Sequence, residues 1–195
     1  MHNIFFAADT HFGHDNIRKH CNRPWNTIDE HDDALIQRWN AVVRKGDTVY
    51  HLGDFAMIQR KFENIDRMKL YRKLRMALKG NIILIKGNHD KMSQEVYSCF
   101  SEVHDLREIK INGEKIVLCH FPLRSWNGAF HGRKHCFGHV HARFEKFDTG
   151  VSTDVGVDVP EWNFTPVPCE LVLAKLNKKL EIFKARHSGD DNVED

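Results

Sequence analysis

Residues 81–90 read Asn-Ile-Ile-Leu-Ile-Lys-Gly-Asn-His-Asp, an apolar run that ends in three polar side chains. The run is short and apolar on both faces, which predicts a buried strand over residues 81–86. In open α/β sheets, ligands bind beyond the carboxyl ends of the strands. We therefore expect Asn88, His89 and Asp90 to lie at the edge of a functional site.

Four further stretches repeat this pattern, in which an apolar run ends in Asp or His. They are Asp9-Thr10-His11 after residues 4–8, Asp54 after residues 49–52, His120 after residues 116–119, and Gly138-His139-Val140-His141 after Cys136-Phe137. Asp, Asn and neutral His supply the oxygen and nitrogen donors that suit Mn²⁺, Fe, Zn²⁺ or Ni²⁺. Each motif alone is common by chance, but five in series predict a two-metal site on one rim of a sheet.

Strand and helix patterns alternate over the first half of the chain. Residues 3–8 and 48–52 read as strands, and a short helix is expected around residues 15–21. Thr27-Ile-Asp-Glu30 is a capping box ahead of an amphipathic stretch, and residues 59–78 have helical periodicity. This alternation predicts an α/β fold with a partly parallel central sheet.

The second half of the chain has a different pattern. Residues 106–111 and 114–119 flank Asn112-Gly113, which predicts a hairpin with a type I′ turn. Residues 121–134 read as a long loop that is rich in glycine, aromatic and basic residues. The stretch 171–186 fits either a helix or a second hairpin.

The composition indicates an ordinary globular protein. The 195 residues fit one domain over residues 1–187, with a flexible acidic tail over residues 188–195. A net charge of +2 gives no electrostatic case for a nucleic-acid-coating protein. The five cysteines are scattered, no basic segment with a long apolar stretch precedes the first strand, and no apolar run reaches ~20 residues. We therefore expect a cytoplasmic protein without membrane contact. The sequence leaves a monomer and a homodimer equally open.

Taken in order, the five motifs resemble the signature of the calcineurin-like metallophosphoesterase superfamily. The opening Asp-Thr-His-Phe-Gly-His of residues 9–14 resembles a short subfamily of bacterial and phage phosphoesterases, and residues 155–159 are similar to the end of that subfamily. The resemblance implies an α/β protein with a four-layer α/β-β/α sandwich, in which two mixed β-sheets are flanked by helices and the metals lie at the rim.

The resemblance also implies two divalent metal ions, with Mn²⁺ expected first and Fe, Ni²⁺ or Zn²⁺ as alternatives. It assigns seven ligands: Asp9, His11 and His141 to the first metal, Asn88, His120 and His139 to the second, and Asp54 to both. One carboxylate can bridge metals that lie about 3.5–4 Å apart. The two aspartates leave part of the metal charge uncompensated, which favours a phosphate group attacked by a metal-bridging hydroxide.

His89 remains for the chemistry itself. We expect it to act as the general acid that protonates the leaving oxygen, with Asp90 orienting it; the alternative is that His89 only donates a supporting hydrogen bond. Substrate contacts are expected from His14 and from the loop residues Arg124, Trp126 and His131. Arginine can hold phosphate oxygens and Trp126 can stack on a base, although Trp126 can equally pack its own loop down.

The expected activity is that of a dinuclear metal-dependent phosphoesterase. Residues 55–59 lack the aspartate and arginine with which protein phosphatases of the superfamily continue the Gly-Asp motif. This argues against a phosphoprotein phosphatase. The aromatic and basic loop and the small fold favour a phosphodiesterase acting on a nucleotide, a cyclic nucleotide or another small phosphodiester. A DNA or RNA nuclease and a phosphomonoesterase are the alternatives. A non-catalytic protein-binding scaffold is the third reading, but such members lack the histidine that this chain has at position 89.

Overall fold

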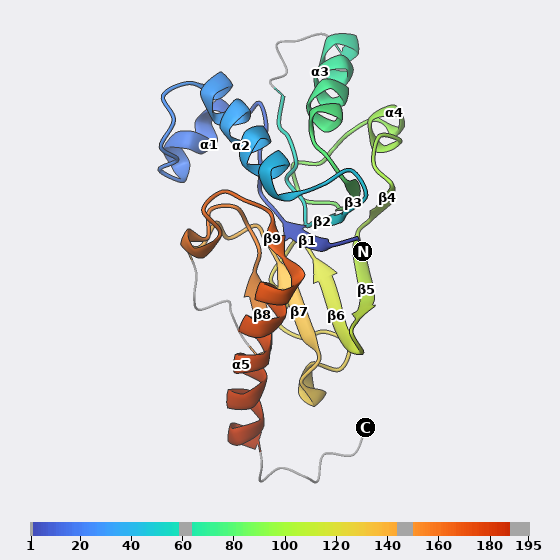
Figure 1. Ribbon diagram of the computed structural model, residues 1–195, viewed down its shortest axis with the longest axis vertical. Coiled ribbons are helices and arrows are strands. Elements are labelled where there is room, and N and C mark those ends of the chain that lie inside the picture. Colours follow the sequence, from blue (N-terminus) through green and yellow to red (C-terminus); the bar gives the residue numbers. More distant parts are fainter. Residues whose placement is uncertain (1, 59–63, 144–149, 188–195) are drawn as a thin grey trace.

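The structure is a computed structural model that describes residues 2–58, 64–143 and 150–187. Two mixed β-sheets flanked by helices build it, as expected from the sequence (Figure 1). The elements are β1 (Ile4–Ala7), α1 (Asp15–His20), α2 (Ile28–Val42), β2 (Thr48–His51), α3 (Asn64–Ala77), β3 (Asn81–Ile85), α4 (Gln94–Tyr97), β4 (Glu102–His104), β5 (Leu106–Ile111), β6 (Glu114–Cys119), the 3-10 helix η1 (Ala129–His131), β7 (Lys134–Phe137), β8 (Ser152–Asp154), the 3-10 helix η3 (Pro160–Trp162), β9 (Val167–Pro168) and α5 (Cys169–His187).

The first sheet has the strand order β4-β3-β2-β1-β9. Strands β1 to β4 run parallel, and β9 pairs antiparallel with β1. Parallel strands that are covered on both faces read as continuous apolar runs, which explains the sequence of β3. Because β1, β2 and β3 point the same way, the motifs that follow them emerge at one edge.

The second sheet has the order β5-β6-β7-β8. The hairpin of β5 and β6 is confirmed, and its turn residues Asn112 and Gly113 have φ angles of 51° and 84°. Positive φ at both central positions is what a type I′ turn requires. Strands β6, β7 and β8 are parallel, so the segments after β6 and β7 also leave at a common edge.

Two apolar clusters hold these layers together. One lies between the sheets, where Phe6 and Leu52 meet Ile116 and Leu118, and α5 adds Leu176. The other lies on the opposite face of the first sheet, which α2, α3 and α4 cover. Both clusters leave the carboxyl ends of the strands free to carry polar side chains.

The structure tests the helices that the sequence predicted. Thr27 caps α2 as part of a capping box with Glu30. Residues 171–186 lie within the helix α5, which excludes the alternative of a hairpin. Val172 and Leu176, one helical turn apart, pack into the core between the sheets. The first residues of the predicted helix 59–78 and the acidic tail 188–195 lie outside the described ranges. Within those ranges, no helix has the length and apolarity needed to cross a membrane.

Candidate metal centre

Hydrogen bonds from backbone amides join four of the five motifs at the rim. The amides of Asp9 and His11 donate to the carbonyls of Gly53 and Asp54, which joins the segments after β1 and β2. The amide of Gly138 donates to the carbonyl of His120, and the amide of His139 donates to the carboxylate of Asp9. The last of these bonds connects the rims of the two sheets.

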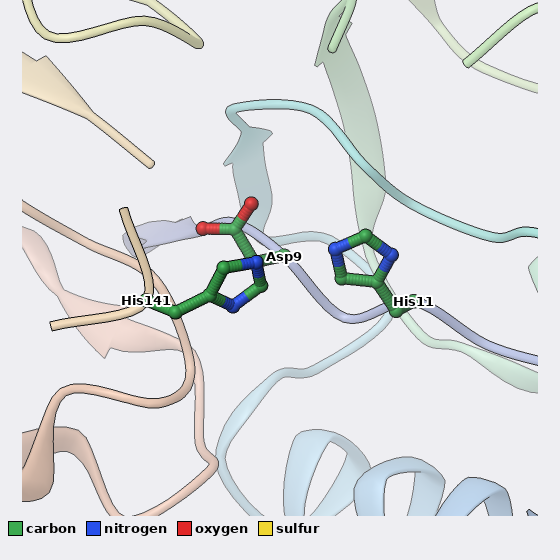
Figure 2. Close-up of side chains that lie close together, drawn as sticks. All are labelled: Asp9, His11 and His141. Atoms are coloured by element: carbon green, nitrogen blue, oxygen red, sulfur yellow. The ribbon is translucent and has the colours of Figure 1, made fainter. Parts of the chain in front are cut away.

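The first donor group contains Asp9, His11 and His141, whose ligand atoms lie within 4.8 Å of one another. Figure 2 shows the three side chains side by side, with Asp9 and His11 on the segment after β1 and His141 arriving from a different part of the chain. Asp9 and His11 are almost completely buried. This is the set that the resemblance assigned to one metal.

The second donor group contains Asp54, His120 and His139, again within 4.8 Å. Asn88 joins it, because its Oδ1 lies 3.1 Å from Nε2 of His120. Asp54 lies between the groups: its Oδ2 is 3.5 Å from Nε2 of His11 and 3.6 Å from Nε2 of His120. All seven residues predicted as ligands are therefore assembled in one place.

The hydrogen bonding of His120 shows that these groups fit cations. Its Nδ1 lies 2.7 Å from the carbonyl oxygen of Leu52, so Nδ1 must carry the proton. Burial lowers the pKa of His120, so its Nε2 is an unprotonated acceptor that faces the oxygens of Asn88 and Asp54. Three acceptors that converge without a hydrogen are satisfied by a metal ion.

His11 supports the same conclusion independently. Among the described residues, its Nε2 is one of three buried side-chain polar atoms with no hydrogen-bond partner. Burial lowers the pKa of His11 well below its usual value, so the ring is neutral. A buried unsatisfied nitrogen costs about 1–3 kcal/mol, and a metal bond would remove that cost.

The backbone at the rim is strained. Of the ten described non-glycine residues with positive φ, five are candidate ligands: Asp9, His11, Asp54, His139 and His141. Such conformations cost about 1–3 kcal/mol each and persist only where the surroundings enforce them. Gly87 shows how tightly the rim is packed, because a Cβ there would lie 2.3 Å from Oδ1 of Asp54. The strain is concentrated where the ligand atoms must converge.

Arg23 and Asp158 hold His141 in place, and the sequence did not assign either of them. Asp158 Oδ2 lies 2.7 Å from Nδ1 of His141, which directs Nε2 toward the other donors. Although burial alone would lower it, the bond to Asp158 raises the pKa of His141 to about 10, so a metal ion would displace the proton on Nε2. Arg23 grips both oxygens of Asp158 at 2.8 and 2.7 Å and donates to the carbonyl of Asp9 at 2.6 Å. Although burial alone would raise it, the bonds from His141 and Arg23 lower the pKa of Asp158, so its carboxylate is charged.

Cys21 forms a third group of nearby donors with His141 and Asp158. Because Arg23 occupies both oxygens of Asp158, this group has less donor capacity to offer than the other two. The segment 155–159 was noticed for its resemblance, but no spacing rule connects Asp158 with Arg23, which is 135 positions away.

We expect the substitution Asp158→Asn to weaken metal binding about 10–100-fold, because partners that orient a ligand histidine have effects of this size. Competition against a chromogenic chelator measures the affinity. Asp29→Asn on the exposed face of α2 is the matched control. Thermal unfolding in chelator separates a loss of folding from a loss of metal. Unchanged metal affinity in a folded Asp158→Asn protein would show that Asp158 has no positioning role.

His89 and His14 lie beside the donor groups. Nε2 of His89 is 3.9 Å from Oδ2 of Asp54, and its side chain is 36% exposed. Its ring centroid lies 5.4 Å from that of His11 and 6.1 Å from that of His14. Burial lowers the pKa of His14 to about 4, so His14 is a neutral hydrogen-bonding group.

Asp90 has a different task from the one expected. Its carboxylate accepts hydrogen bonds from the backbone amides of Gly87, Asp54 and Phe55 at 2.7–2.9 Å. These bonds tie the segment after β3 to the segment after β2. Asp90 therefore positions the backbone around Asp54, and its carboxylate is engaged there instead of with the ring of His89.

The loop 121–134 runs near the metal ligands only at its beginning. Phe121 packs on His139 with a centroid distance of 4.9 Å. The loop must then return to the start of β7, because β6 and β7 are parallel. Trp126 is 9% exposed and donates from Nε1 to the carbonyl of Arg133, and exposed His131 belongs to η1 just before β7.

This path corrects the expectation that the whole loop borders the site. Trp126 packs the loop down, which was the alternative considered for it, and His131 lies toward the far end of the sheet. Arg124 is exposed, and its expected substrate contact stays a prediction. Among the candidate substrate contacts, only His14 is shown in ring contact with the metal-centre histidines.

The two sheets and the donor-lined rim define an α/β protein built to bind metal ions. The family model described as calcineurin-like phosphoesterase matches residues 2–130. An uncharacterized protein of Methanocaldococcus jannaschii is 35% identical over 181 residues, which is 91% of this chain and 93% of that protein. The gene 66 protein of Mycobacterium phage L5 is 39% identical over 56 residues, covering 29% of this chain and 27% of that protein.

A solved structure has a similar fold. A protein of unknown function from Aquifex aeolicus superposes with a TM-score of 0.68 at 26% identity, covering 90% of this chain and 100% of that one. Together with the match over residues 2–130, these similarities identify the chain: it belongs to the calcineurin-like phosphoesterase family. It is accordingly a phosphoester hydrolase by family, and divalent metal ions are the cofactors that the family implies.

Proposed function

We propose that this protein is a dinuclear metal-dependent phosphodiesterase that acts on a nucleotide-like substrate. The observation that supports this most strongly is the position of Asp54, whose Oδ2 lies between Nε2 of His11 and Nε2 of His120. A carboxylate in this place can serve two metals at once. Manganese is our first choice because the donor set is rich in oxygen and nitrogen, with Fe, Ni²⁺ and Zn²⁺ as alternatives.

Bound divalent ions would polarise the phosphate and lower the pKa of the attacking water. Residues of the chain would orient the metal ligands and supply a proton. Asp158 and Leu52 fix the tautomers of His141 and His120, so each presents its Nε2 to the centre. His89, half-exposed beside Asp54, is positioned to give a proton to the leaving oxygen.

The preference for a diester over a phosphoprotein rests on the residues that follow Asp54 in the sequence. Residues 55–59 contain no aspartate and no arginine to grip a phosphoprotein in the way protein phosphatases do.

The five cysteines are all free thiols, which fits our proposal of a cytoplasmic location.

With Mn²⁺ or Ni²⁺ added, we expect the purified protein to hydrolyse bis(p-nitrophenyl) phosphate and to lose that activity on chelation. Elemental analysis should find about two metal ions per chain. A screen of mononucleotides, cyclic nucleotides, dinucleotides and sugar phosphates then defines the preference. A protein that binds its metals yet hydrolyses none of these esters would contradict the proposed enzymatic function and favour the alternative of a non-catalytic protein-binding scaffold.

A further inference from the structure

A cleft of about 960 Å³ opens directly beside the metal rim. One wall is formed by His14, Asn88 and His89, which belong to the rim or touch it. The rest of the lining includes residues of α3 and the residues that follow His89, from Lys91 to Val96. A ligand held beside His89 can therefore extend into this cleft.

Two basic side chains line the cleft. Arg67 of α3 and Lys91 after β3 both line it. The acidic residue in the same lining, Asp15, is ion-paired with Arg18. Two cations in the lining that His89 shares favour an anionic group on the bound ligand.

The apolar part of the cleft lining suits a flat aromatic group. Met57, Met68 and Met92 contribute to the cleft, and the hydroxyl of Tyr71 is fixed by a hydrogen bond to the carbonyl of Ala56 at 3.1 Å. Methionine side chains are flexible and polarizable, so they pack well against aromatic rings. Methionines beside an arginine and a lysine match a base together with a phosphate.

The direction of the reaction decides which part of the substrate enters. This step rests on the proposed function, in which His89 protonates the leaving oxygen. Because His89 both approaches Asp54 and lines the cleft, we place the alcohol that receives its proton on the cleft side. The leaving arm of the diester is then the part that the cleft accommodates.

We propose that the cleft between α3 and the segment after β3 is a leaving-arm subsite for a nucleotide that carries a further phosphate, held by Arg67 and Lys91. The preferred substrate is thus an oligonucleotide-like diester with at least two phosphates. In the hydrolysis, the oxygen of water bonds to phosphorus as the P–O bond to the leaving arm breaks, and the departing oxygen takes a proton from His89. The proton that the water releases passes to solvent, from which His89 is reprotonated.

Dithymidylate and trithymidylate test this directly. Dithymidylate has one diester and leaves a nucleoside without phosphate, whereas one of the two diesters of trithymidylate always leaves an arm that keeps the other phosphate. We expect kcat/KM to be about tenfold higher for trithymidylate, the size of one charge-assisted hydrogen bond. The double variant Arg67→Ala/Lys91→Ala should lose this gain through KM, while Arg67→Lys with Lys91→Arg should keep most of it.

Two controls make the result specific. Lys69→Ala removes a cation from an exposed position of the same helix, outside the cleft, and should keep the full gain. Bis(p-nitrophenyl) phosphate has no second phosphate, so the double variant should hydrolyse it at the wild-type rate. Metal content reports folding of each variant.

The inference is overturned if trithymidylate has no advantage over dithymidylate, or if the advantage survives in the double variant. If bis(p-nitrophenyl) phosphate is hydrolysed but neither oligonucleotide is, the subsite fails while the proposed function stands. If the metal-loaded protein hydrolyses nothing, the proposed function fails, and anisotropy of labelled trithymidylate still decides whether Arg67 and Lys91 bind it. Equal binding by wild type and the double variant would then reject the subsite.

Discussion

The substitution Asp54→Asn should lower kcat/KM for bis(p-nitrophenyl) phosphate by about 10³-fold or more and reduce the metal content to at most about one ion per chain. The reason is that Oδ2 of Asp54 faces a histidine of each donor group, at 3.5 and 3.6 Å. A neutral amide cannot bridge two dications, and metal stabilisation of a transition state is worth several kcal/mol, with each 1.36 kcal/mol equal to tenfold in rate.

Folding should survive this change. The amide of His89 donates to Oδ1 of Asp54 at 2.9 Å, and an asparagine retains an oxygen that can accept this bond. Asp105→Asn is the control, because Asp105 is exposed and its partner is Lys86. Circular dichroism, elemental analysis and steady-state rates complete the comparison. Two metals and a normal rate in Asp54→Asn would rule out the bridging role.

The metal rim could be predicted from the sequence because its information is local. Each ligand follows an apolar strand by one to a few residues, so the strand pattern and the ligand pattern are read together. The hairpin at Asn112-Gly113 and the cap at Thr27 were predictable for the same reason. In all of these cases the physical cause lies within a few positions of the residue.

The supporting residues could not be predicted in this way. Arg23 donates a hydrogen bond to Asp158, which lies 135 positions away in the sequence. Asp90 accepts hydrogen bonds from backbone amides, and because every residue except proline has one, the sequence does not indicate the partners. The left-handed backbone of Asp9 and His141 is likewise imposed by tertiary contacts, because local preference disfavours it. The path of the loop 121–134 depends on β6 and β7 being parallel, which only the assembled sheet reveals.

The substitution His89→Ala should remove most of the hydrolysis of dithymidylate while leaving both metals bound. General acid catalysis contributes about 10²–10⁴-fold. His89 supplies only its backbone amide to Asp54 as a hydrogen bond, at 2.9 Å, and its side chain stands 3.9 Å from the same carboxylate. Alanine keeps that amide, so the metal centre should persist when the imidazole is removed.

The leaving group distinguishes a proton donor from a residue that merely shapes the site. p-Nitrophenolate departs readily without a proton, whereas the alkoxide of dithymidylate needs one. The loss in His89→Ala should therefore be larger for dithymidylate than for bis(p-nitrophenyl) phosphate. His104→Ala, a half-exposed histidine paired with Glu102, should alter neither rate. Equal losses on both substrates would assign His89 to binding, and full activity would remove it from the mechanism.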